Sequence, residues 1–203
     1  MNGGYDDGYR ACPCFWGNKP GSLVLALLRE YCFKDKFVLD LGCGEGKNAA
    51  ALARAGARVT AVDCSELAVA NGKKAFPDIE IDWQLRSVIT YEWIQQGYDV
   101  IIMYGLLHCL PSEDSILETI NNSVSSTKPG GLHILVSFNN RHHDLSAHPN
   151  LTPTLLPHSA YASAYSRHNI LTISDSDLHE THPHNNIPHH HSLTRLIAQI
   201  NHA

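Results

Sequence analysis

Residues 37–46 read Phe37-Val38-Leu39-Asp40-Leu41-Gly42-Cys43-Gly44-Glu45-Gly46. The first five form a short apolar run that ends in glycines, which is typical of a strand buried in a parallel sheet. Glycines at 42, 44 and 46 let the backbone turn sharply and lie flat against a ligand. The alanine-rich residues 48–55, followed by Gly56, predict a helix with a glycine at its end. The segment therefore predicts a strand, a ligand-binding loop and a helix.

Strands and helices alternate on both sides of this unit. We expect further strands at 58–63, 79–83, 98–103 and 132–138, and helices at 22–33, 65–76 and from 112 to just before 129. This order predicts an α/β fold, a Rossmann-like, doubly wound and mostly parallel sheet. Residues 169–174 and 192–200 are expected to close the sheet as an antiparallel strand pair.

The chain is expected to form a single domain, since it has 203 residues, of which 43% are hydrophobic and 17% are charged. Within residues 1–203 we expect a cap and a helix at 1–35, with 1–18 irregular, and a ligand-binding core at 36–138. Residues 139–203 are expected to hold an insertion on the substrate side and the closing strands.

Charge and hydropathy restrict the class of partner. The formal net charge is −5, and the sequence has no Lys/Arg cluster of the kind that neutralises nucleic-acid phosphates. A small-molecule substrate is therefore expected, and no nucleic acid. Because the sequence shows neither a leader pattern nor an apolar run long enough to span a bilayer, we expect a cytoplasmic protein with no membrane partner.

The acidic residues around the glycine loop indicate the charge of the ligand. Asp40 and Glu45 suit a ligand that carries an ammonium group and a positive sulfur, and they disfavour a diphosphate. The third glycine of a dinucleotide fingerprint would fall at Lys47. Asp63 ends the second predicted strand, where a carboxylate can accept both hydroxyls of a ribose.

Residues 37–66 resemble the cofactor motifs of class I S-adenosylmethionine-dependent methyltransferases, and the resemblance extends through Phe138. It implies that S-adenosylmethionine is the cofactor and that the three loop glycines line its methionine and ribose portion. Residues 104–108 are similar to the family segment at the sulfonium and the substrate mouth. Ser87 lies where the family often has an acidic residue for the adenine amino group. The candidate cofactor-binding residues are Asp40, Gly42, Cys43, Gly44, Gly46, Asp63, Cys64, Ser87, Tyr104 and Trp16.

Residues 176–181, Ser-Asp-Leu-His-Glu-Thr, resemble the tellurite-resistance branch of the family, whose members act on soft chalcogen oxyanions and related acceptors. His179 matches the histidine of that branch, but Glu180 stands where an arginine is expected. A second arginine expected downstream is also absent. The acceptor is therefore expected to be a soft nucleophile, a thiol or chalcogen compound, and not a strong anion.

Three residues are candidates for catalysis. His108 and His179 would take a proton from a protonated acceptor, since imidazole titrates near neutral pH; a structural role is the alternative for each. Arg10 would orient the acceptor. Trp16 and its neighbour Phe15 would either close over the sulfonium through a cation–π interaction or pin the lead-in to the core.

The last third of the chain is rich in histidine. Imidazoles suit Zn, Ni or Cu, so a metal ion at this hairpin is a candidate partner. The histidines concerned are His179, His182, His184, His189, His190 and His191. The alternative is a polar hairpin of solvated histidines. The competing function is accordingly a metal-binding or sensing protein on a methyltransferase scaffold.

Overall fold

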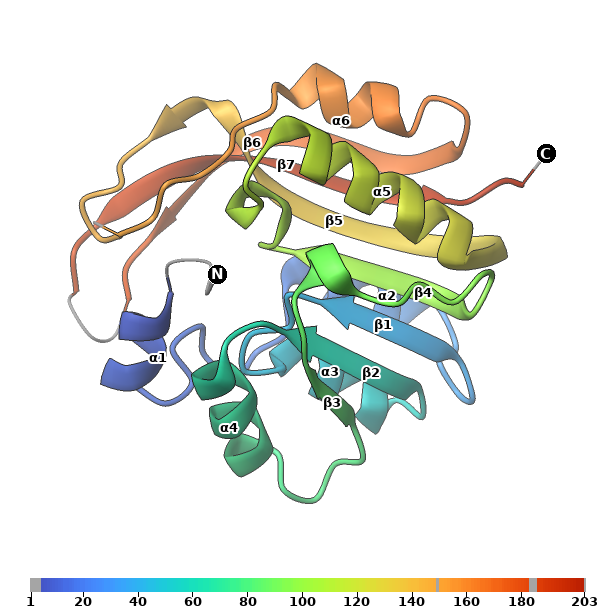
Figure 1. The fold of residues 1–203 in the computed structure, drawn as a ribbon, viewed down its shortest axis with the longest axis horizontal. Helices are drawn as coiled ribbons and strands as arrows, with labels where there is room; N and C mark the ends of the chain where they lie inside the picture. The colour runs from blue at the N-terminus through green and yellow to red at the C-terminus, as the bar shows by residue number, and fades with distance from the viewer. Residues whose placement is uncertain (1–4, 149, 183–185, 203) are drawn as a thin grey trace.

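The computed structural model describes residues 5–148, 150–182 and 186–202. Seven strands form one sheet in the order β3-β2-β1-β4-β5-β7-β6 (Figure 1). The strands are β1 Phe37–Leu41, β2 Arg58–Asp63, β3 Asp82–Leu85, β4 Tyr98–Tyr104, β5 Thr127–His143, β6 Asn169–Glu180 and β7 His189–Gln199. The α-helices are α1 Asp6–Ala11, α2 Ser22–Glu30, α3 Lys47–Arg54, α4 Glu66–Ala75, α5 Glu113–Ser126 and α6 His158–Ala164.

The first five strands are parallel, and β7 pairs antiparallel with both β5 and β6. The predicted Rossmann-like sheet with an antiparallel closing pair is therefore confirmed. In such a sheet the carboxyl ends of the parallel strands share one edge, where ligands bind.

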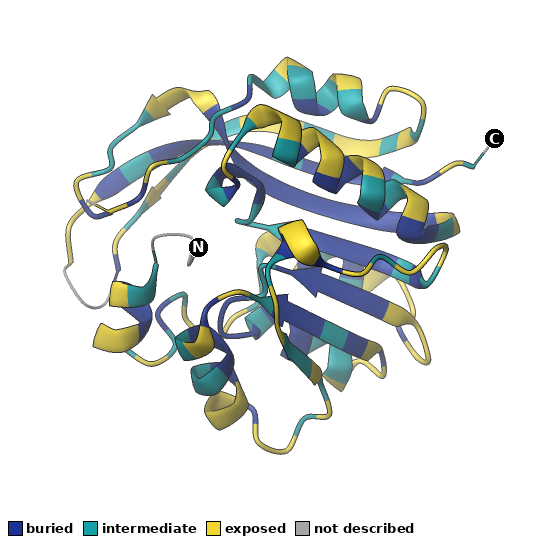
Figure 2. Cartoon of the chain, viewed as in Figure 1, coloured by how far each residue is buried: buried dark blue, intermediate teal, exposed yellow. Residues whose placement is uncertain are grey.

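The sheet separates two apolar cores because side chains alternate between its faces along each strand. Leu39 and Leu41 of β1 pack in the core that includes Ile116 of α5. Val38 packs on the opposite face, in the core that includes Leu27 of α2 and Leu52 of α3. The central strands are consequently buried on both faces (Figure 2), which explains why their sequences read as continuous apolar runs.

Serine side chains begin two of the helices that flank the sheet. The Ser65 hydroxyl accepts from the backbone N–H of Ala68 at the start of α4, and the Ser112 hydroxyl accepts from that of Ser115 at the start of α5. Each serine satisfies one of the backbone donors that a helix leaves unpaired at its first turn. Among the described residues, no helix is both long enough and apolar enough to cross a membrane.

Three sequence predictions need correction. Residues 1–18 are not wholly irregular, because they contain α1. The third strand is Asp82–Leu85 and not 79–83, because only from Asp82 does the chain pair with β2. Residues 139–168, which the sequence predicts only as an insertion, include the end of β5 and helix α6.

The closing strands are longer than predicted, and this places the histidine-rich end of the chain at the ligand edge. β5 continues past Phe138 to His143, which lies opposite His191 of β7. On the other side of β7, Glu180 lies opposite His189. Because β7 runs antiparallel to β5, its first residues lie beside the last residues of β5.

Candidate active site

A cavity of about 610 Å³ lies at the carboxyl ends of the parallel strands. On its β1–β2 side it is lined by the glycine loop and Asp63, and on its β5–β7 side by Phe138, Glu180 and Arg195. Because the sheet order places β1 and β4 between these groups, the cavity extends across the switch point of the sheet.

The loop glycines all adopt the left-handed conformation that favours glycine, with φ of 65° at Gly42, 55° at Gly44 and 78° at Gly46. Gly42 and Gly44 line the cavity, as does Cys43 between them. Gly46 does not line it, which corrects its predicted role. A Cβ added at Gly46 would lie 2.2 Å from the ring of Trp83, so this glycine allows close packing of the loop on β3.

Asp63 is held at the end of β2 by two backbone hydrogen bonds. Its Oδ2 accepts from the N–H of Gly44 over 2.8 Å, and its Oδ1 accepts from that of Ser65 over 2.9 Å. Burial raises the pKa of the carboxyl above its usual value. The carboxylate keeps accepting capacity for a ligand, and both Asp63 and its neighbour Cys64 line the cavity.

Asp40 does not line the cavity, contrary to the sequence prediction. Its side chain is almost fully buried, and burial raises the pKa of its carboxyl to about 7. On β1 it shares a face with Val38, which packs towards α2 and α3. The carboxylate therefore lies behind the loop, where it accepts a hydrogen bond from the backbone of Ala49.

Ser87 and Tyr104, both candidates for cofactor binding, lie in the wall of the cavity. The Ser87 hydroxyl accepts from the backbone N–H of Ile89 and so begins a short 3₁₀ turn, Val88–Thr90. Tyr104 ends β4, and its ring lies so close to Gly21 that an added Cβ would approach it within 2.3 Å.

The aromatic lead-in both packs on the core and lines the cavity. Trp16 borders the cavity, and its Nε1 donates to the hydroxyl of Tyr9, which also lines it. Phe15 is buried, in a cluster with Tyr9 and Ala68 of α4. Arg10 is exposed and forms a 2.7 Å ion pair with Asp7. It does not line the cavity, although the sequence analysis assigns it to orient the acceptor there.

His108 lines the cavity as a neutral hydrogen-bond donor. The backbone N–H of Phe138 donates to its Nδ1 over 3.3 Å, which leaves the ring proton on Nε2, 3.3 Å from the hydroxyl of Tyr5. Burial, together with the neighbouring His143 and His148, lowers the pKa of His108 to about 3. The sequence analysis expects a base whose pKa lies near neutrality, and the pKa of the His108 ring lies well below that range.

His179 points away from the cavity, and its neighbour Glu180 points into it. Side chains alternate along β6, and residues directly opposite each other on paired strands project to the same face. His179 is paired with His190, and Glu180 with the buried His189. Of the two neighbours, Glu180 lines this cavity and His179, the residue predicted from the sequence, does not.

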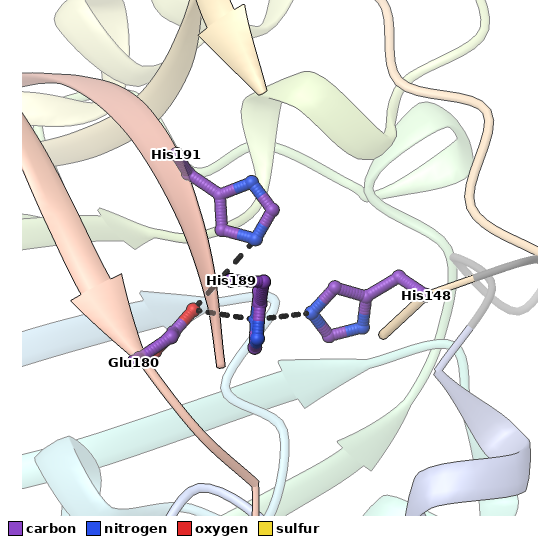
Figure 3. A group of neighbouring side chains, drawn as sticks. All are labelled: His148, Glu180, His189 and His191. Atoms are coloured by element: carbon purple, nitrogen blue, oxygen red, sulfur yellow. Dashed lines mark hydrogen bonds and ion pairs between the residues drawn. The ribbon is translucent and has the colours of Figure 1, made fainter. Parts of the chain in front are cut away.

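The inward side chains of this hairpin form a cluster with one residue of the loop after β5. It consists of His148, Glu180, His189 and His191, and one nitrogen or oxygen of each lies within 4.8 Å of those of the others (Figure 3). The sequence identified His189 and His191, and it missed His148 and Glu180. The alternate spacing of 189 and 191 was the signal for a shared face.

The other histidines of the predicted metal set lie elsewhere. His190 is on the outward face with His179. His182 borders the cluster, with its Nε2 2.9 Å from Nε2 of His148. His184 lies outside the described residues.

Residues 38–131 match the family model described as a methyltransferase domain. An uncharacterized methyltransferase of Mycobacterium tuberculosis is 33% identical over 101 residues, which are 50% of this chain and 50% of the relative. The ubiquinone biosynthesis O-methyltransferase of Coxiella burnetii is 34% identical over 105 residues, 51% of this chain and 44% of the relative. The match thus spans about half the length of these relatives, or less.

Solved structures share the fold at low sequence identity. TehB from Haemophilus influenzae superposes with a TM-score of 0.72 at 20% identity, over 88% of this chain and 62% of that protein. The magnesium protoporphyrin IX methyltransferase of Synechocystis, solved with S-adenosylmethionine bound, gives 0.63 at 19% identity, over 88% and 76%. Residues 38–131 are therefore similar to a methyltransferase domain, and the solved structures share its fold.

Proposed function

We propose that this chain transfers the methyl group of S-adenosylmethionine to a small-molecule acceptor with a soft nucleophile, a thiol or a chalcogen compound. The observation that carries the proposal is the single cavity that borders both Asp63 and Glu180. Methyl transfer needs the donor and the nucleophile in line within one water-excluding site, and a continuous cavity meets that need.

The donor is assigned to the β1–β2 side of the cavity. The free lone pairs of Asp63 suit the two ribose hydroxyls, and the left-handed backbone at Gly42 and Gly44 lets the methionine portion lie close to the loop. Ser87 is assigned to the adenine end. Trp16 supplies an aromatic face that attracts the positive sulfur.

The acceptor is assigned to the β5–β7 side. Phe138, Leu178 and Leu193 give this side an apolar surface, and Glu180 adds a carboxylate. A carboxylate disfavours a strongly anionic acceptor, and apolar surface suits a soft neutral one. Arg195, whose guanidinium donates to the Ser176 hydroxyl, is the cation that takes the orienting role first expected of Arg10.

The reaction itself is an in-line displacement. The acceptor sulfur attacks the methyl carbon, the new S–C bond forms as the bond to the sulfonium breaks, and the electron pair stays on the sulfur of S-adenosylhomocysteine. His108 donates a hydrogen bond from Nε2 to the hydroxyl of Tyr5 and does not remove the proton of the acceptor. A thiol acceptor must therefore react as a thiolate formed by another group.

The second candidate is a metal-handling protein, and the cluster of His148, Glu180, His189 and His191 favours it. Turnover separates the two functions. The test is a panel of thiols, selenite, tellurite and small amines, with S-adenosylhomocysteine release measured by liquid chromatography. We expect release with thiols or reduced chalcogen compounds. Donor binding without release from any acceptor, together with stoichiometric metal, would favour the second candidate.

A further inference from the structure

We propose that His148, Glu180, His189 and His191 form a binding site for a divalent transition-metal ion of the Zn²⁺ class, at the acceptor side of the cavity. The inference rests on the proposed function only for the role of the ion. Binding itself follows from the side chains alone and is tested without donor or acceptor.

The distances suit a small ion. Nε2 of His148 and Nε2 of His189 are 3.2 Å apart, and Oε1 of Glu180 is 3.6 Å from Nε2 of His189 and 3.9 Å from Nε2 of His191. Ligands about 2.0–2.1 Å from a tetrahedral Zn²⁺ are about 3.3 Å from one another. These three distances are near that value, and the remaining pairs, which lie within 4.8 Å, would close by up to about 1.5 Å around the ion.

Hydrogen bonds outside the cluster set the tautomers of two rings. Nδ1 of His189 donates to the carbonyl of Ile187 over 2.8 Å, so its Nε2 carries the lone pair. The ring of His143 donates through Nε2 to the carbonyl of Asn139, and its Nδ1 then accepts from Nδ1 of His191 over 3.4 Å. Nε2 of His191 is therefore unprotonated as well. Metal-bound histidines are typically oriented in this way by the partner of their second nitrogen.

His191 gives independent support for a ligand. Its ring is fully buried, and among the described residues its Nε2 has no hydrogen-bond partner. This nitrogen points at the carboxylate of Glu180 from beyond hydrogen-bond distance. A buried, unpaired acceptor is costly, and an ion between these groups would satisfy it.

The donor set identifies the class of ion. Three imidazoles and one carboxylate suit Zn²⁺, Co²⁺ or Ni²⁺, and Mg²⁺ and Ca²⁺ prefer sites made of oxygen alone.

The place of the cluster gives the ion a role in the proposed reaction. Glu180 borders both the cluster and the cavity, and the ring of Phe138 lies between His191 and His108, with centroids 4.2 Å and 3.9 Å away. An ion at the cavity wall lowers the pKa of a thiol that binds it as a fifth ligand. The thiol would lose its proton to solvent on coordination, and the resulting thiolate would be the nucleophile.

The test uses the untagged full chain, stripped with a chelator and titrated with Zn²⁺ in competition with a chromophoric chelator. We expect one ion per chain. His191→Ala and Glu180→Gln should each weaken binding by at least about 100-fold, because loss of an orienting partner alone costs 10–100-fold. The matched controls are His179→Ala and His190→Ala, on the outward face of the same strands, which should keep wild-type affinity.

Two further measurements separate the outcomes. Binding of S-adenosylhomocysteine to the stripped protein reports the methyltransferase site and the fold of each variant, independently of the metal. Co²⁺ loaded into the wild-type protein should give the visible bands of a four-coordinate site, and a small thiol should add a sulfur-to-metal charge-transfer band. No binding by wild type, or equal losses in inward and outward variants, overturns the site. A Co²⁺ spectrum that thiols leave unchanged overturns the role of the ion.

Discussion

The backbone N–H of Phe138 donates a hydrogen bond to Nδ1 of His108 across 3.3 Å, and the two rings stack with centroids 3.9 Å apart. The two interactions fix both the tautomer and the plane of the imidazole. His108 consequently presents an N–H, not a lone pair, on its remaining nitrogen.

The first prediction concerns the pH dependence of the reaction. Because the pKa of His108 is lowered to about 3, its ring stays neutral throughout the range in which a free imidazole titrates. We therefore expect that His108 contributes no inflection near pH 6.5 to the pH profile of kcat/KM. The profile of His108→Gln should have the same shape as that of the wild type. His108→Leu should lower kcat/KM by about three- to tenfold, the value of one hydrogen bond, and His108→Gln should lose less. An inflection that disappears in both variants would identify His108 as the base.

The second prediction concerns donor binding. Asp63→Ala should weaken the affinity for S-adenosylhomocysteine by about 1.5–3 kcal/mol, the usual contribution of hydrogen bonds to a charged group. Calorimetry on the purified protein measures this. Asp63 also holds the N–H groups of Gly44 and Ser65, so Asp63→Asn, which keeps one acceptor, should lie between wild type and alanine. The exposed Asp35→Ala is the control and should bind normally; equal affinities in all variants would remove Asp63 from the site.

The third prediction separates backbone strain from close packing in the glycine loop. Gly46→Ala should lower the free energy of unfolding by about 1–3 kcal/mol from the left-handed backbone, with a further loss from the approach to Trp83. Gly130 has a similar φ of 76°, and its nearest neighbour lies 3.9 Å from an added Cβ, so Gly130→Ala should show strain alone. Urea unfolding of both variants tests this, and equal losses would contradict the packing role.

The fourth prediction concerns stability in acid. His133 is fully buried between the hydroxyls of Thr127 and Tyr165, and burial lowers its pKa to about 3. In the unfolded chain the ring binds a proton below about pH 6.5, and in the folded chain it does not. The unfolded state therefore binds more protons between these values, so stability is fully present above about pH 6.5 and is lost as the pH falls, by up to about 1.4 kcal/mol per pH unit.

Urea unfolding at neutral and at mildly acidic pH measures this loss. His133→Gln keeps a polar side chain that does not titrate, so its stability should fall less on acidification than that of the wild type. The exposed His142 provides the control, and His142→Gln should leave the pH dependence of stability unchanged. A parallel fall in all three proteins would show that other groups carry the acid sensitivity.

Sequence reasoning predicts the parallel half of this fold well because local signals determine it. Apolar runs, glycines and helix caps predict the positions of β1, β2 and β4. Most apolar residues of these strands are buried, as their sequence pattern indicates. The third strand was misplaced because the alternation of Ile79 and Ile81 is a local signal, and its position as an edge strand depends on pairing with β2.

The acceptor side was predicted less well, because register decides it. Two adjacent residues, His179 and Glu180, project to opposite faces, and only the pairing with β7 determines which one meets the cavity. A shift of one residue would exchange them. His148 was missed for a related reason, since it joins the cluster from a loop far away in the chain.

The sheet order also sets the sequence of events during synthesis. Within the described part of the chain, β6 pairs only with β7, which leaves the ribosome after it. The strand must therefore remain unpaired until β7 is made and inserts between it and β5. Strands β1 to β5 can pair while translation continues, but the part of the cavity wall that β6 and β7 form is completed only after β7 has been made.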